Sequence, residues 1–192
     1  MSPHARVRAA SAHRVLTEPL LQELLAVSDF PSPPPVSQDR QFVLGQHLRL
    51  SILTSAEETE GRHDLSDITL PGGAGTPLHL HTGYEERIWV VSGSLTVWAG
   101  PETFTLRSGD FYAIPMNTPH TIKAGSDGAR TLNITSPGKF ADLVRRSGTP
   151  AHLATPETAW DMGLFQAITE ELGDVILGPP GATPADLERA AE

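Results

Sequence analysis

The chain has 192 residues, of which 39% are hydrophobic, which is enough for one domain with a buried core. Its formal net charge of −9 argues against a nucleic-acid partner, because phosphate binding requires a basic surface. Cysteine is absent, which excludes disulfide bonds and thiolate metal ligands.

The segment before residue 41 is expected to lie outside the main domain. We expect residues 1–14 to form a flexible tail, and they lack the apolar stretch of a secretory signal. Residues 15–40 are expected to contain a short amphipathic helix, LTEPLLQELLAV, and a stiff proline-rich connector, FPSPPPVS. Since no apolar run approaches the ~20 residues of a membrane span, we expect a cytoplasmic protein without a membrane partner.

Residues 41–135 alternate short β-like runs with turn signals rich in glycine and proline. Leu95 and Val97 alternate with polar residues, as do Leu132 and Ile134. The expected strands cover residues 42–44, 47–53, 64–70, 77–80, 86–91, 94–98, 103–106, 110–114, 120–123 and 130–135. Many short strands at this spacing predict an all-β core, a sandwich or a small barrel.

Residues 136–192 are expected to form a helical extension packed on this barrel. Ser136 and Pro137 have the residue types of a helix start, and Gly148 ends that helix. A second helix is predicted from Pro156 to residue 172, with Gly173 as its stop. An extended run, DVILGPPG, and a last short helix from residue 184 follow.

Three histidines and a glutamate are candidates to converge on one point. In a strand, His79 and His81 point to the same face, with backbones about 6.6–7 Å apart. Glu86, or its neighbour Glu85, follows a Thr-Gly turn and can swing back toward both rings, and His120 begins a later strand. Three imidazoles and one carboxylate suit one divalent transition metal per chain: Fe, Mn, Ni, Co, Cu or Zn.

The residues around these candidates resemble the two motifs of the cupin superfamily. The first motif, G-x5-H-x-H-x4-E-x6-G, is matched by Gly73, His79, His81, Glu86 and Gly93. The second, G-x5-P-x-G-x2-H-x3-N, is matched by Gly109, Pro115 and His120, with Asn117 and Ala124 in place of the second glycine and the asparagine. This spacing selects Glu86 over Glu85, and Asn117 is a residue that tolerates a left-handed backbone.

Beyond the motifs, residues 45–182 resemble single-domain bacterial cupins of the quercetin 2,3-dioxygenase-like group. The resemblance implies an antiparallel jelly-roll barrel with short flanking N- and C-terminal helices, a metal in the barrel mouth and a homodimer. It also implies oxidative cleavage of a small enolic or aromatic, flavonol-like substrate, with dioxygen as the second substrate.

Such chemistry assigns Glu86 the role of the base that takes the substrate's hydroxyl proton. Strand parity and proximity to the motifs suggest a pocket for the flat substrate formed by Ile88, Val90, Tyr112, Ile114, Met116 and Ile122. Two alternatives remain open. One is an isomerase, cyclase or lyase that uses the metal as a Lewis acid without dioxygen, and the other is a non-enzymatic cupin that binds metal or a small molecule.

Overall fold

The computed structural model describes residues 35–45 and 48–190. The predicted tail of residues 1–14, the predicted helix of residues 16–27 and the start of the proline-rich connector lie outside the described residues. Within residues 35–45 and 48–190, every helix is too short or too polar to span a bilayer.

The described chain consists of ten strands, three α-helices and one short 3-10 helix. The first part contains η1 (Gln38–Arg40), β1 (Gln41–Leu44), β2 (Leu48–Thr54), β3 (Asp64–Leu70), β4 (Pro77–His81), β5 (Glu85–Ala99), β6 (Glu102–Arg107), β7 (Phe111–Ile114) and β8 (His120–Ser136). The second part contains α2 (Phe140–Ser147), β9 (Thr149–Pro150), α3 (Met162–Leu172), β10 (Asp174–Pro180) and α4 (Pro184–Ala190).

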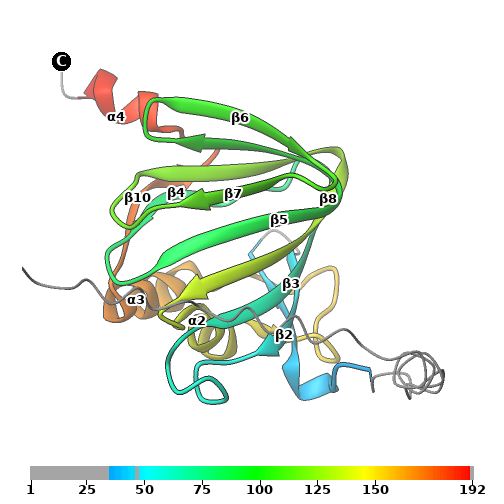
Figure 1. The fold of residues 1–192 in the computed structure, drawn as a ribbon. Coiled ribbons are helices and arrows are strands. Elements are labelled where there is room, and N and C mark those ends of the chain that lie inside the picture. The colour runs from blue at the N-terminus through cyan, green and yellow to red at the C-terminus, as the bar shows by residue number, and fades with distance from the viewer. Residues whose placement is uncertain (1–34, 46–47, 191–192) are drawn as a thin grey trace, which may run out of the picture. The chain divides into compact units, whose positions relative to one another are not determined.

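All strand pairs are antiparallel, and the strands curve around a common interior (Figure 1). One path of neighbours runs β10-β4-β8-β3-β2-β1-β9, and β5 pairs with β6, β7 and β8. Strand β8 therefore connects the two sides, because it pairs with β3 and β4 as well as with β5. The predicted antiparallel jelly-roll barrel is confirmed.

Two strands are much longer than their sequence runs predicted. The expected breaks near residues 92–93 and 124–129 lie within β5 and β8, which stay paired from Glu85 opposite Ser136 to Ala99 opposite His120. The register shifts around Gly93, as expected for a β-bulge. The glycines at these positions therefore distort the paired strands but do not end them. The neighbouring strand continues to satisfy the backbone hydrogen bonds on both sides of each glycine.

Gly93 itself occupies a place that a side chain cannot share. Its φ is 76°, and a Cβ built there would lie 2.1 Å from the carbonyl oxygen of Gly128. Asn117 also has a positive φ, 61°, as its place in the second motif predicted. Gly93 lies at the bulge within β5, and Asn117 lies in the connection between β7 and β8.

Two helices begin later than predicted. Ser136 stays in β8, where its hydroxyl donates to the carbonyl oxygen of Arg62 at 2.9 Å, so α2 begins only at Phe140. The second helix begins at Met162 instead of Pro156, because Asp161 is the residue whose side chain caps it. The predicted ends of both helices, at Gly148 and Gly173, are confirmed.

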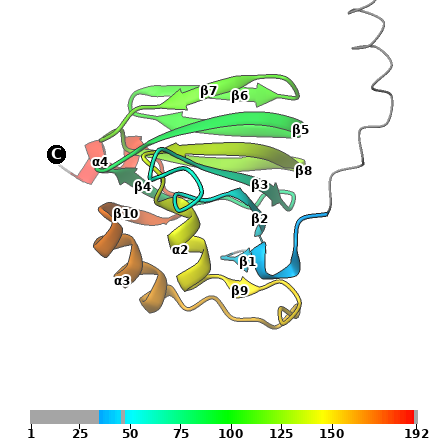
Figure 2. The same ribbon diagram turned by 60° about the horizontal axis from the view of Figure 1, so that its bottom comes forward.

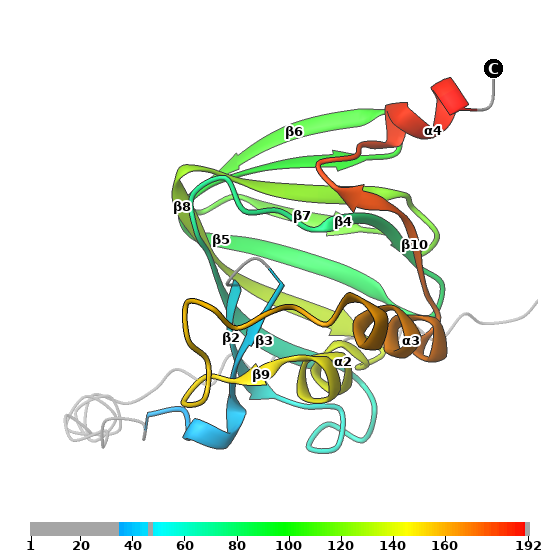
Figure 3. The same ribbon diagram turned by 180° about the vertical axis from the view of Figure 1, so that it is seen from behind.

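Helices α2 and α3 pack against each other beside the strands (Figure 2), and α3 leads directly into β10 (Figure 3). Helix α2 buries Ala141, Leu143 and Val144, and α3 buries Phe165 and Ile168. These side chains join the apolar cluster of the barrel. Burial of each large aliphatic or aromatic side chain contributes roughly 1.5–3 kcal/mol, so the extension is part of the folded core.

Candidate metal centre

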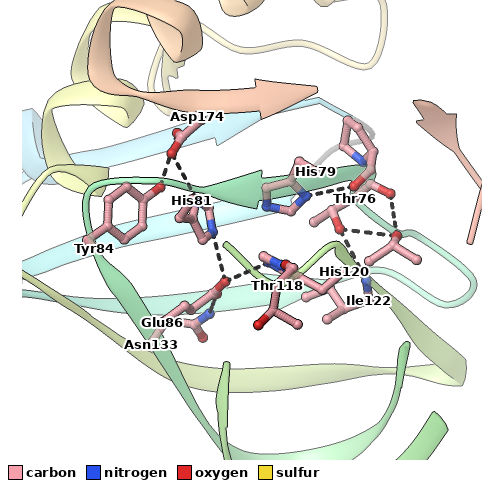
Figure 4. Close-up of polar contacts among 12 residues, drawn as sticks. Thr76, His79, His81, Tyr84, Glu86, Thr118, His120, Ile122, Asn133 and Asp174 are labelled. Atoms are coloured by element: carbon pink, nitrogen blue, oxygen red, sulfur yellow. Dashed lines mark hydrogen bonds and ion pairs between the residues drawn. The ribbon is translucent and has the colours of Figure 1, made fainter. Parts of the chain in front are cut away.

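Strand register brings the three candidate histidines together. His79 of β4 lies directly opposite His120 of β8, so both side chains point to the same face of the sheet. His81 lies two residues beyond His79 in the same strand and shares that face. The ring centroids are 4.2–4.9 Å apart, and Figure 4 shows the rings gathered around one point.

Backbone carbonyls fix the tautomers of two of these rings. His79 donates from Nδ1 to the carbonyl oxygen of Pro77, and His120 donates from Nδ1 to that of Thr118, each at 2.8 Å. Because a carbonyl oxygen can only accept, the hydrogen lies on Nδ1 in both rings. The Nε2 lone pairs of His79 and His120 are therefore left available to a ligand.

His81 is oriented by a carboxylate from the C-terminal extension. Its Nδ1 donates to Oδ1 of Asp174 at 2.8 Å, and Tyr84 donates its hydroxyl hydrogen to Oδ2 of the same residue at 3.1 Å. The Tyr84 ring stacks on the His81 ring at 4.2 Å. This arrangement leaves Nε2 of His81 facing the other two histidines (Figure 4).

Glu86, near the start of β5, completes the cluster. Its Oε2 lies 3.4 Å from Nε2 of both His81 and His120. Its other oxygen, Oε1, accepts a hydrogen bond from Asn133 at 2.6 Å, and Asn133 is held in turn by Thr131. Glu85, the alternative candidate, has the opposite parity and forms an ion pair with Arg87.

The four side chains fit a metal ion. Each offers one ligand atom, and these atoms all lie within 4.8 Å of one another. Neighbouring ligands of an ion with ~2.1 Å bonds are about 3.0–3.4 Å apart, which agrees with the spacing of Glu86 from two of the rings. In addition, no group among the described residues hydrogen-bonds the buried Nε2 of His120. A metal ion would provide the partner that this nitrogen lacks.

Burial and close contact control the protonation of the cluster. Burial, together with the neighbouring rings of His120 and His81, lowers the pKa of His79 well below its usual range. Burial also opposes a charge on His81, but hydrogen bonds to Asp174 and Glu86 outweigh it and raise the pKa of His81 to about 9. Burial opposes ionisation of Glu86, yet the adjacent rings of His120 and His81 hold its pKa well below its usual range.

The cluster lies in the wall of a mostly apolar cavity in the barrel. Strands β2, β3, β4, β8 and β10 and helices α2 and α3 contribute to its lining, including Leu50, Ile68, Ile122, Phe140, Trp160 and Phe165. Its polar lining comes from the cluster, from the inward face of β8, and from Thr76, Tyr84, Thr169 and Asp174. The site can therefore bind a small molecule with one polar group at the cluster and an apolar body.

The six residues predicted to line the substrate pocket lie in different places. Ile122 does line the cavity. The other five lie outside the lining of this cavity: Ile88, Val90 and Ile114 are buried in the core, Tyr112 packs against Phe104, and Met116 is exposed. The side chains of Ile88 and Val90 in β5 point inward, as their alternation predicted. They pack beside β7, however, whereas the cavity is bounded by β2, β3, β8 and the helical extension.

Sequence reasoning missed three residues that contact the cluster. Tyr84 lies inside the first motif, between His81 and Glu86, so its position was a signal. Asn133 lies between Thr131 and Thr135 on one face of β8. The sequence pattern of this strand drew attention only to the apolar residues on its other face. For Asp174, the sequence carries no signal that it would meet a histidine 93 residues away.

Comparison with known proteins agrees with this architecture. Residues 66–135 match the family described as Cupin domain, and this range contains both motifs' metal-ligand candidates. These residues form a cupin domain. The match ends at the last residues of β8, so α2, α3 and β10 lie beyond the matched part of the cupin domain.

Two curated relatives share part of this cupin domain. The quercetin 2,3-dioxygenase of Bacillus subtilis (strain 168) is 38% identical over 90 residues, which are 45% of this chain and 27% of that protein. The quercetin 2,3-dioxygenase of Aspergillus japonicus is 31% identical over 78 residues, 38% of this chain and 22% of that protein. The matches thus span about a quarter of each relative's length.

Among solved structures, the ectoine synthase from P. lautus superposes with a TM-score of 0.50 and 19% sequence identity. The superposition covers 65% of this chain and 90% of that one. At this identity the likeness concerns the fold alone.

Proposed function

We propose that this cupin is a metal-dependent dioxygenase that acts on a small enolic or aromatic, flavonol-like substrate. The observation that carries the proposal is the cluster of three imidazole nitrogens and one carboxylate oxygen within 4.8 Å of one another, in the wall of an apolar cavity. The partial likeness to two quercetin 2,3-dioxygenases supports the choice of substrate class. His79, His81, Glu86 and His120 are the proposed metal ligands.

Bound there, a divalent transition metal would supply Lewis acidity toward the enolic oxygen of the substrate. The Glu86 carboxylate takes the proton: the O–H bond of the enol breaks, the proton moves to a carboxylate oxygen, and the electron pair stays on the substrate oxygen. Asn133 donates to Oε1 and holds the carboxylate in place, with Oε2 toward the rings of His81 and His120. The electron-rich enolate that results is the species that dioxygen oxidises.

The apolar wall contributes by excluding water and orienting the substrate. Aromatic and aliphatic side chains such as Phe140, Trp160 and Ile122 suit a flat, weakly polar molecule. Its enolic oxygen is then the one group directed to the cluster. Exclusion of water also protects an electron-rich enolate from reprotonation.

Oxygen uptake by metal-loaded protein tests the proposal. We expect uptake with enolic aromatics, with quercetin as the first substrate, and its loss in His120→Ala. His152→Ala is the matched control, because His152 is exposed and lies outside the cluster. In protein that elemental analysis shows to have kept its metal, Glu86→Gln should lower kcat by about 10²–10⁴-fold, the usual contribution of a general base.

The alternatives predict different results in the same assay. An isomerase, cyclase or lyase would convert its substrate without consuming oxygen. A binding protein would take up metal and ligand without turnover. Metal-loaded protein that consumes no oxygen with any enolic substrate would contradict the dioxygenase proposal.

We further propose that the protein acts as a homodimer. The support is an apolar patch on the outer face of the barrel: Trp89 of β5 pairs directly with Phe111 of β7, and their side chains are 53% and 56% exposed. Val91 and Ile134 extend the patch. Contiguous exposed apolar surface of this kind is typical of protein interfaces.

A further inference from the structure

We infer that Asp174, from the helical extension beyond the matched part of the cupin domain, is a positioning residue that holds His81 in the orientation needed for metal binding. This inference rests on the proposed metal site. It assigns to the extension a direct part in that site, in addition to its part in the core.

Strand register brings Asp174 to His81. Strand β10 pairs with β4 such that Asp174 lies directly opposite His81, and cross-strand partners share a face of the sheet. Both side chains therefore point inward, although 93 residues separate them. Figure 4 shows Asp174 reaching from the neighbouring strand to the side of the His81 ring that faces away from Glu86.

The start of β10 is fixed at the required place. Gly173 ends α3 with a φ of 90°, and its carbonyl oxygen accepts hydrogen bonds from the backbone nitrogen and the hydroxyl of Thr82. Thr82 immediately follows His81. The turn from α3 into β10 is thereby tied to the residue next to the ligand, which leaves Asp174 no freedom to slip along β4.

Asp174 is buried, and both of its oxygens are used by the site. Its side chain is only 2% exposed, and it accepts from His81 Nδ1 at 2.8 Å and from Tyr84 at 3.1 Å. A buried carboxylate is costly unless it is paired and hydrogen-bonded. With the ring of His81 neutral, Glu86 and Asp174 together carry two negative charges, which a divalent cation balances.

Tyr84 fixes the carboxylate in turn. Burial, followed by the charges of Asp174 and Glu86, raises the pKa of Tyr84 well above its usual range, so its hydroxyl remains a donor. Its ring also stacks on His81. A carboxylate bonded to the distal nitrogen of a histidine ligand sets the tautomer and increases the basicity of the ligating nitrogen.

The test is the Zn(II) affinity of the full-length chain, measured by competition with a chromophoric chelator, together with the visible spectrum of the Co(II)-loaded protein. Asp174→Ala should weaken Zn(II) binding by about 10–100-fold, the usual effect of losing such a partner. Asp174→Asn should weaken it less, because the amide oxygen still accepts the Nδ1 hydrogen while the charge is lost. The Co(II) bands should shift in both variants, since the ring of His81 is no longer held.

Asp64→Asn is the matched control. Asp64 is also a buried carboxylate, 1% exposed, but it accepts from the backbone of Ala141 and contacts none of the four proposed ligands. The control should lose thermal stability and keep the Zn(II) affinity and Co(II) spectrum of the wild type. If Asp174→Ala fails to fold, Asp174→Asn, which preserves the shape, decides by the same comparison.

The outcomes separate this inference from the proposed function. Wild-type Zn(II) affinity and Co(II) spectrum in the folded Asp174 variants would overturn the inference, as would equal weakening in Asp64→Asn. Wild-type protein that binds neither ion would overturn the metal site and the inference together. If the variants show the predicted order of Zn(II) affinities but the wild type takes up no oxygen, the dioxygenase proposal is overturned and the role of Asp174 still stands.

Discussion

Replacement of Gly93 by alanine should destabilise the barrel far more than the same change at Gly73. Both glycines have a φ of 76°. A left-handed backbone costs an alanine roughly 1–2 kcal/mol at either position. At Gly93 the new Cβ would also lie 2.1 Å from the Gly128 oxygen and 2.9 Å from the Ala129 Cα, whereas at Gly73 nothing in the described part of the chain lies within 4 Å.

The clash at Gly93 involves the backbone of β8, which cannot move without disturbing its pairing with β5. Overpacking of this kind adds about 1–3 kcal/mol, so Gly93→Ala should cost roughly 2–5 kcal/mol in all. Urea denaturation measures the difference between the two variants. With an m-value of about 2 kcal/mol/M, the midpoint of Gly93→Ala should lie roughly 0.5–1.5 M below that of Gly73→Ala. Equal midpoints would refute the argument that close approach of the backbone, and not φ alone, requires glycine at this position.

Three further predictions concern the site and the surface. Removal of the metal with a chelator should lower Tm by roughly 5–10 °C in differential scanning fluorimetry. The reason is that an ion at 100 times its Kd stabilises the fold by about 2.7 kcal/mol. An unchanged Tm would count against a bound ion. In the metal-free protein, the pKa of His81 is raised from 6.5 to about 9, so the stability that its charge contributes is fully present below pH 6.5 and is lost as pH rises through about 9. Urea midpoints measured from pH 6.5 to 9.5 should therefore fall, and a steady rise would contradict the assigned contacts. Finally, light scattering should show the proposed dimer for the wild type and a monomer for Trp89→Glu, and a dimer that persists in the variant would place the interface elsewhere.

Local sequence information was sufficient for the cluster. The i, i+2 spacing of His79 and His81 fixed their common face, and the motif spacing distinguished Glu86 from Glu85. The structure brings these residues and His120 together because each motif residue lies within a strand or next to a tight turn, where spacing in sequence determines direction in space.

Features that depend on distant pairing could not be predicted in the same way. Glycines at 93 and 128 were interpreted as turns, but β5 and β8 continue past them because each strand supplies the other's hydrogen bonds. The pocket was assigned from the strands nearest the motifs, whereas β2, β3 and the helical extension also contribute to its lining. Asp174 belongs to this class, since only the pairing of β10 with β4 brings it to His81.

The metal content of the purified protein, determined by elemental analysis, bears most directly on whether the four side chains form a metal site. We expect close to one transition-metal ion per chain in the wild type and in His152→Ala, and loss of that ion in His120→Ala. Absence of metal from the wild type even after reconstitution, or an unchanged content in His120→Ala, would contradict the site and the oxygenase chemistry that depends on it.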